Sequence, residues 1–258
     1  MTTATIVESW KHGSDGFFKF LDDVKPVVRS SRGGFIPFVP GPRERAEIVQ
    51  ALDGTRSTVV LSWPRRHGKT ATSIMILLWR FLTRKTENIA IVANSEKQVT
   101  STAFKILRDT FENTAFLQRL TKAGSIEVGM EAVRFPAMSS VIQAYSSNPS
   151  ALWGKALTAA QLSELHAAKG ADVLEVLTGS LLDSEGSMLL IDSTVGPMSS
   201  PLYALYQAHQ RGDDPSLFFS HIQYDDLEDA CANSPAWIDP IRLRAAARRM
   251  LPQRLIFV

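Results

Sequence analysis

The stretch VVLSWPRRHGKT, from Val59 to Thr70, decides the fold of this chain. Its β-branched and apolar residues predict a strand over 58–63, and helical spacing predicts a helix over about 70–84. A short turn that closes with Gly-Lys-Thr lies between the two. This order of strand, turn and helix predicts a loop whose backbone N–H groups and helix N-terminus bind phosphate oxygens.

Each residue of the turn has an expected role in binding a nucleotide. Lys69 is expected to reach the β and γ phosphates, and the Thr70 hydroxyl to bind the Mg²⁺ that bridges them. The expected cofactor-binding residues are Arg66, His67, Gly68, Lys69, Thr70 and Ala71. The common pattern G-x-x-x-x-G-K-[ST] begins with a glycine, and Trp63 occupies that position here.

Outward from this loop, strands and helices alternate. Further strands are expected at 89–93, 157–162, 188–192 and 217–224, and a strand pair or meander at 126–135 and 140–145. Helices are expected at 43–52, 96–113 and, rich in arginine, 241–250. Alternation of this kind predicts an α/β fold with a mainly parallel central sheet flanked by helices.

Composition favours one soluble α/β domain. The 258 residues are 45% hydrophobic and 21% charged, with a net charge of +2, so any nucleic-acid contact must be local. The single Cys231 fits a reducing cytoplasm. The most apolar stretch, 74–82, contains Arg80 and is far shorter than the roughly 20 residues of a membrane span. The acidic N-terminus does not resemble a signal peptide.

The quoted stretch resembles the deviant Walker A motif of phage large terminases, which lacks the first glycine and carries an arginine four residues before the lysine. Arg65 occupies that arginine position. The resemblance implies that Arg65 is an arginine finger or a γ-phosphate sensor, because a guanidinium stabilises charge on the phosphate oxygens. Arg66 is the less favoured candidate for this role.

Three more segments match the same family in the same order, so that the resemblance covers roughly 36–210. IVANSEKQ at 91–98 resembles the strand and helix start after the Walker A helix. GKALTAAQLSELHAA at 154–168 occupies the Walker B position and implies Glu164 as the general base. STVGPMSSPLYALY at 193–206 resembles the coupling motif and implies that Ser193 and Thr194 sense loss of the γ phosphate.

One position departs from the family. The residue before Glu164 is normally an aspartate that holds the Mg²⁺ shell, and here it is Ser163. A hydroxyl can hold a metal-bound water but carries no charge, so we expect Ser163 to weaken Mg²⁺ affinity or turnover. Gln161 is also unusually polar for a core strand. No proton-transfer role is expected for His67 or His166.

The resemblance implies a P-loop NTPase of the additional-strand, RecA-like type that hydrolyses ATP with Mg²⁺. It further implies packaging of double-stranded viral DNA into a procapsid in the host cell cytoplasm. The implied partners are the portal protein, the small terminase subunit and further copies of the chain in a pentameric ring, although the isolated chain could be a monomer. No membrane is involved. The implied organisation is an N-terminal segment at 1–34, an ATPase core at 35–225 and a helical segment at 226–258.

Large terminases also have a nuclease domain, towards which 226–258 would lead. We expect no nuclease activity, because the remaining acids share one loop instead of lying on separate strands: Asp225, Asp226, Glu228 and Asp229. Adenine recognition is expected around Phe38 to Arg43, with Gln50 as a weak alternative. The C-terminal arginines form a solvated face, a subdomain contact or a DNA contact: Arg242, Arg244, Arg248 and Arg249.

Two other functions remain open at this point. A nucleotide or small-molecule kinase uses the same loop but does not need Glu164 as a water-activating base. A non-hydrolysing, nucleotide-dependent assembly module is favoured by Ser163. Neither accounts for Arg65 together with the segment 193–206.

Overall fold

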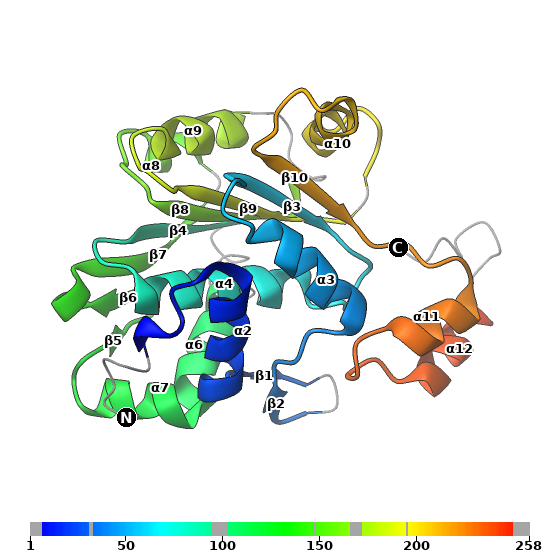
Figure 1. Cartoon of the computed structure of the whole chain (residues 1–258), viewed down its shortest axis with the longest axis horizontal. Helices are drawn as coiled ribbons and strands as arrows, with labels where there is room; N and C mark the ends of the chain where they lie inside the picture. Colours follow the sequence, from blue (N-terminus) through cyan, green and yellow to red (C-terminus); the bar gives the residue numbers. More distant parts are fainter. Residues whose placement is uncertain are drawn as a thin grey trace.

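A computed structural model describes residues 7–30, 33–93, 103–146, 148–165, 172–194 and 196–249. A sheet of eight strands runs between two layers of helices (Figure 1). Its strand order is β10-β3-β9-β8-β4-β7-β6-β5. The strands are β3 (Thr58–Ser62), β4 (Asn88–Ala93), β5 (Glu127–Val128), β6 (Ala132–Phe135), β7 (Ser140–Ser146), β8 (Ala159–Ser163), β9 (Met188–Asp192) and β10 (Leu217–His221).

The six strands from β10 to β7 pair in parallel, and β6 and β5 extend the sheet antiparallel at one edge. The predicted meander is therefore β5-β6-β7, whose last strand also pairs with β4. β9 lies between the strand of the Gly-Lys-Thr loop, β3, and the strand of the predicted Walker B segment, β8. This inserted strand confirms the predicted α/β fold of the additional-strand, RecA-like type.

One face of the sheet carries the larger hydrophobic core, and α4 (Lys69–Thr83) lies at its centre. Nearly all of α4 is buried, which is typical of a core helix that is apolar on every side. Figure 1 shows the surrounding helices on this face. They are α2 (Gly13–Val24), α3 (Pro42–Ala51), α6 (Phe104–Asn113) and α7 (Ala115–Lys122).

The opposite face carries a second apolar cluster under three helices (Figure 1). Successive residues of β3 alternate between the two cores, since Val59 and Leu61 belong to one and Val60 to the other. Coverage of both faces is what parallel strands require. The helices on this face are α8 (Pro149–Leu152), α9 (Asp172–Leu181) and α10 (Pro201–Arg211), and a 3₁₀ turn, η2 (Pro136–Met138), joins β6 to β7.

The N-terminal segment shares the core of the sheet domain. The Phe17 ring packs edge-on against Trp79 of α4 at 5.8 Å, and Trp10 packs against Phe20 at 5.5 Å. A hairpin of β1 (Val27–Arg29) and β2 (Phe35–Pro37) follows α2. No separate core marks the described part of 1–34, so the boundary after residue 34 stays a prediction.

Beyond β10 the chain forms α11 (Leu227–Asn233) and α12 (Pro240–Ala247), which lie at one end of the molecule (Figure 1). The expectation of a single acidic loop is wrong for Glu228 and Asp229, which lie in the first turn of α11. Asp226 caps this helix by accepting from the Asp229 N–H, and acids in a first turn favour a helix. Within the described ranges, no helix combines the length and apolar character that a membrane crossing requires.

Candidate active site

The carboxyl ends of β3, β9 and β8 meet at one edge of the sheet. In the parallel register, Asp192 of β9 lies opposite Leu61 of β3 on one side and Ser163 of β8 on the other. The Gly-Lys-Thr loop leaves β3 at this edge and enters α4. Residues from three strand ends and one helix N-terminus therefore face a common site, which is where open α/β sheets bind ligands.

The loop has a backbone that suits phosphate binding. Arg66 and Gly68 both have left-handed conformations, with φ of 69° and 76°. Gly68 is required on two grounds, because a Cβ there would be strained and would lie 2.9 Å from the Trp237 ring. Loops of this kind turn successive N–H groups towards one point and form anion-binding concavities.

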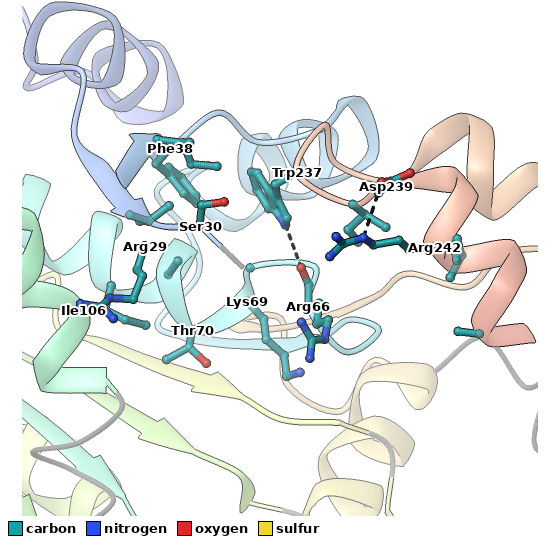
Figure 2. A pocket seen from close by; sticks show the side chains of 17 residues that line it. Arg29, Ser30, Phe38, Arg66, Lys69, Thr70, Ile106, Trp237, Asp239 and Arg242 are labelled. Atoms are coloured by element: carbon teal, nitrogen blue, oxygen red, sulfur yellow. Dashed lines mark hydrogen bonds and ion pairs between the residues drawn. The ribbon is translucent and has the colours of Figure 1, made fainter. Parts of the chain in front are cut away.

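The amino group of Lys69 links the predicted site residues electrostatically. Lys69 begins α4, and its side chain is only 7% exposed. Burial lowers the pKa of Lys69, Glu164 and Asp192 oppose that effect, and Arg65 adds to it. The structure therefore places Arg65, Glu164 and Asp192 within electrostatic range of Lys69. Figure 2 shows the Lys69 and Arg66 side chains extending from the same loop.

Thr70, predicted as a metal ligand, has a buried carboxylate as its neighbour. Its Oγ1 donates to Asp192 Oδ2 at 2.6 Å, and Asp192 is 0% exposed. The Ser163 hydroxyl lies 3.3 Å from the same Oδ2. Gln161 Nε2 donates to Ser163 Oγ at 2.6 Å and also to Asp192 Oδ1. Sequence reasoning missed Asp192, although a charged residue at the end of the apolar strand MLLID could have indicated it.

Among the described residues, the side chains that contact the Asp192 carboxylate are polar and uncharged. Burial raises the pKa of the Asp192 carboxyl, while its hydrogen bonds with Thr70 and Gln161 and the charge of Lys69 act in the opposite direction. Burial has the larger effect, as expected for a carboxyl group in the interior of a sheet.

Glu164, the predicted general base, follows β8 at the same edge. Its N–H donates to the Asp192 carbonyl at 2.8 Å, and its φ is 58°. A residue other than glycine in this left-handed region is uncommon, and such residues cluster at functional sites. The backbone thus turns sharply at Glu164, next to the phosphate loop. His166, also singled out in the sequence, lies outside the described residues.

Ser193 and Thr194, the predicted coupling residues, follow β9 directly. Ser193 N–H donates to Leu61 O at 3.2 Å, and both residues are buried. They connect the strand that ends at Asp192 to the turn before α10. Their coupling role stays a prediction.

The remaining loop residues differ in what they can offer a nucleotide. The His67 ring is buried, with Nδ1 2.9 Å from Glu44 Oε1 and 3.3 Å from the Tyr224 hydroxyl. Its imidazole therefore stabilises the base of the loop, and any phosphate contact would come from the backbone of residue 67. Arg65 is exposed at the surface of the loop. Ala71 lines the adjacent cavity.

A cavity of about 660 Å³ opens beside the loop, between the β1-β2 hairpin, α6 and α12. Figure 2 shows Trp237 above the loop with Phe38 beside it. The two rings stack with centroids 6.1 Å apart, and Trp237 Nε1 donates to Arg66 O at 2.8 Å. Arg242 of α12 also lines the cavity. Sequence reasoning missed Trp237, which follows β10 and is distant from the loop along the chain.

The residues expected to recognise adenine lie in different surroundings. Phe38 lines the cavity. Arg43 instead binds α11 and the segment before it, through Asp229 at 2.9 Å and the Gln223 carbonyl at 2.7 Å. Gln50 is exposed on α3 and does not line the cavity. Of these candidates, Phe38 is the one that lines the cavity beside the loop.

A phosphate loop between a strand and a helix, in a parallel sheet with an inserted strand, defines a P-loop nucleotide-binding protein. Residues 53–210 match the family described as the terminase large subunit, ATPase domain. The chain therefore belongs to the terminase large subunit ATPase family. This confirms the family resemblance found in the sequence.

Several solved structures that share this fold are large terminases. The large terminase of HK97 bacteriophage has a TM-score of 0.72 and 18% identity over 97% of this chain and 52% of that one. The ATPase domain of the Thermus phage P74-26 large terminase has a TM-score of 0.59 and 16% identity over 81% of this chain and 88% of that one. A large terminase of a thermophilic bacteriophage, in complex with ADP, has a TM-score of 0.55 and 12% identity, with 83% and 50% covered.

These similarities concern the fold, and the chain spans about half the length of the HK97 protein. No curated protein matches the chain significantly.

Proposed function

We propose that this chain is the ATP-hydrolysing motor part of a large terminase, which drives translocation of double-stranded viral DNA into a procapsid. The observation that supports ATP hydrolysis most is the convergence of Lys69 and Thr70, at the start of α4, with Glu164, directly after β8. Family membership supports the coupling of hydrolysis to DNA packaging.

The phosphate loop and the neighbouring cavity bind different parts of the nucleotide. Backbone N–H groups of 66–71 and the N-terminus of α4 bind the phosphates, with the Lys69 ammonium at the β and γ groups. The base enters the cavity beside Phe38 and Trp237. A volume of about 660 Å³ lies within the usual range of small-molecule pockets.

The donor set beside the loop fits Mg²⁺. Thr70 and Ser163 present hydroxyl oxygens, and the carboxylate that joins them adds further oxygen atoms. Mg²⁺ prefers such hard oxygen ligands together with phosphates and water. When bound with ATP, it neutralises charge that develops on the β and γ phosphates.

Glu164 acts on the water that attacks the γ phosphate. Its carboxylate accepts a proton from that water or orients it in line with the bond that breaks. Arg65, near Lys69 and exposed, stabilises the charge on the γ phosphate as an arginine finger or sensor. Ser193 and Thr194 transmit loss of the γ phosphate from the end of β9 towards the DNA-gripping part.

Family membership supports a proposal about the partners of this motor. We propose a homo-oligomeric ring at the portal protein, recruited with the small terminase subunit in the host cell cytoplasm. DNA contact through Lys and Arg to phosphates would make translocation strongly dependent on salt. The exposed Arg248 and Arg249, after α12, are candidates for such contact.

A second function, a nucleotide-dependent assembly module that does not hydrolyse ATP, is favoured by one observation. The Walker B strand ends in Ser163 and not in an aspartate. Such a module would bind ATP tightly and release no phosphate in the presence of portal protein and DNA.

Free-phosphate release from Mg-ATP, with and without double-stranded DNA and portal protein, tests the proposal. We expect release by the wild-type chain, and loss of release with retained ATP binding in Glu164→Gln and Arg65→Ala. Glu175→Gln, an exposed carboxylate of α9, is the matched control. Binding without release in every condition would favour the assembly module. Formation of ADP without free phosphate would indicate a kinase.

A further inference from the structure

The end of β8 lacks the expected carboxylate, but the adjacent strand, β9, ends in one. P-loop NTPases hold Mg²⁺ with the loop Ser or Thr and a Walker B aspartate. Here Ser163 occupies the Walker B position, and Asp192 lies directly opposite it in the parallel register of β8 and β9. A carboxylate is thus present at the same edge of the sheet, one strand away.

One oxygen of Asp192 contacts both hydroxyls that are expected to hold the metal. Asp192 Oδ2 accepts from Thr70 Oγ1 at 2.6 Å and from Ser163 Oγ at 3.3 Å. The three side chains come from a helix N-terminus and two adjacent strand ends. They form a compact set of oxygen ligands beside the phosphate loop, which is the chemistry that Mg²⁺ selects.

The described neighbours of Asp192 do not neutralise the negative charge of its carboxylate. Within the described ranges, its side-chain hydrogen bonds come from Thr70, Gln161 and Ser163, and all three are neutral. Asp192 is fully buried, and burying a carboxylate without a cationic partner is costly. A divalent cation next to Oδ2 would supply the missing positive charge, assisted by the more distant Lys69.

Gln161 has a role in the same cluster. It is 0% exposed in the middle of the sheet, where an apolar residue is normal. Its Nε2 donates both to Ser163 Oγ and to Asp192 Oδ1. The amide therefore holds the second carboxylate oxygen and leaves Oδ2 on the side of Thr70. Two unusual residues of β8, Gln161 and Ser163, are explained by a single carboxylate on β9.

We infer that Asp192 supplies the carboxylate of the Mg²⁺ site, in place of a residue at the end of β8, and that Gln161 and Ser163 position it. The inference rests on the proposed function, because it concerns the metal that accompanies ATP. It removes the reason to expect weakened Mg²⁺ affinity from Ser163, since the charge is present on the adjacent strand.

The test measures how strongly Mg²⁺ promotes binding of the slowly hydrolysed analogue ATPγS. Calorimetric titrations of the wild-type chain are compared with and without Mg²⁺, and the same pair is measured for Asp192→Asn. We expect Asp192→Asn to weaken ATPγS binding by roughly 10- to 100-fold in Mg²⁺, as for loss of a group that supports a metal site. Binding without Mg²⁺ should be unchanged.

Two further variants separate metal binding from structural support. The double variant Ser163→Asp, Asp192→Ser returns the carboxylate to β8, and we expect it to regain the Mg²⁺ dependence. Glu164→Gln removes the other carboxylate of the site and should keep the Mg²⁺ dependence of binding. Paramagnetic resonance of free Mn²⁺, titrated with each protein in the presence of ADP, measures metal uptake without hydrolysis. Thermal unfolding verifies that each variant is folded.

The outcomes distinguish the inference from the function on which it rests. Loss of the Mg²⁺ effect in Asp192→Asn and its return in the double variant support the inference. Equal weakening with and without Mg²⁺, or an unchanged Mg²⁺ effect, overturns it and assigns Asp192 a structural role only. If the wild-type chain does not bind ATPγS at all, the proposed function fails, and this inference fails with it.

Discussion

Two buried carboxylates have opposite surroundings, and they lie at opposite ends of the strands: Glu87 at an amino end and Asp192 at a carboxyl end. Glu87, directly before β4, is 3% exposed and forms an ion pair with Arg80 at 3.0 Å, supported by the Thr158 hydroxyl. Asp192, at the end of β9, is 0% exposed and is bonded by neutral groups among the described residues. Breaking a buried ion pair is costly because it leaves one charge unpaired, whereas a buried carboxylate without a cationic partner is suited to binding a ligand that brings a cation.

The largest effect is expected on stability, when Glu87 loses the arginine with which it is paired. Arg80→Met leaves Glu87 buried and unpaired and also removes the Arg80 bonds to the carbonyls of Gly186 and Thr158. We expect a loss of about 3–5 kcal/mol in the free energy of unfolding, measured by urea denaturation. Arg84→Met, at an exposed arginine of the same region, should change it by no more than about 0.5 kcal/mol. A similar small loss in both variants would remove the distinction between the two carboxylates.

A smaller effect, on affinity alone, is expected at the cavity beside the Asp192 site. Trp237→Ala removes the ring that stacks on Phe38 and covers the loop. Stacking of a base on an aromatic side chain contributes about 1–3 kcal/mol, so ATPγS affinity should fall by about 5- to 150-fold. Trp153→Ala, at a tryptophan that is 68% exposed and does not line the cavity, should bind as the wild type does. Unchanged affinity in Trp237→Ala would place the base elsewhere.

The smallest effect is expected on the stability of the nucleotide-free chain when Asp192 loses its charge. Asp192→Asn keeps the size of the side chain and removes a buried charge that has no contacting cation among the described residues. We expect the free energy of unfolding to change by less than about 1 kcal/mol, in either direction. Urea denaturation beside Arg80→Met gives the direct contrast. A loss as large as that of Arg80→Met would show that Asp192 is a structural residue.

Much of the sheet could be predicted from local sequence. Apolar, β-branched runs placed β3, β4 and β9 at nearly their observed bounds, because buried parallel strands are continuously hydrophobic. The phosphate loop was equally visible, since its residues are adjacent in the chain. The helix α2 was missed although its buried residues have helical spacing, at Phe17, Phe20, Leu21 and Val24.

The residues missed at the site share one physical cause. Asp192 meets Ser163 through the register of β8 and β9, and it meets Thr70 because α4 begins beside the end of β9. Neither contact can be predicted from the sequence of one element alone. Trp237 reaches the loop only because the segment after β10 folds back towards α4. Gln161 carried a signal, since a polar residue in a core strand needs a buried partner, but the sequence did not indicate which one.

The most direct test of the account is the affinity of the chain for Mg-ATP, measured by calorimetry in the wild type and in Lys69→Ala. Lys155→Ala, at an exposed lysine, is the control. We expect one saturable site in the wild type and the control. Lys69→Ala should weaken binding by about 30-fold or more, because losing one partner of a buried charge pair costs about 2 kcal/mol or more. No binding by the wild type, or equal affinity in Lys69→Ala, would contradict a nucleotide site at this loop.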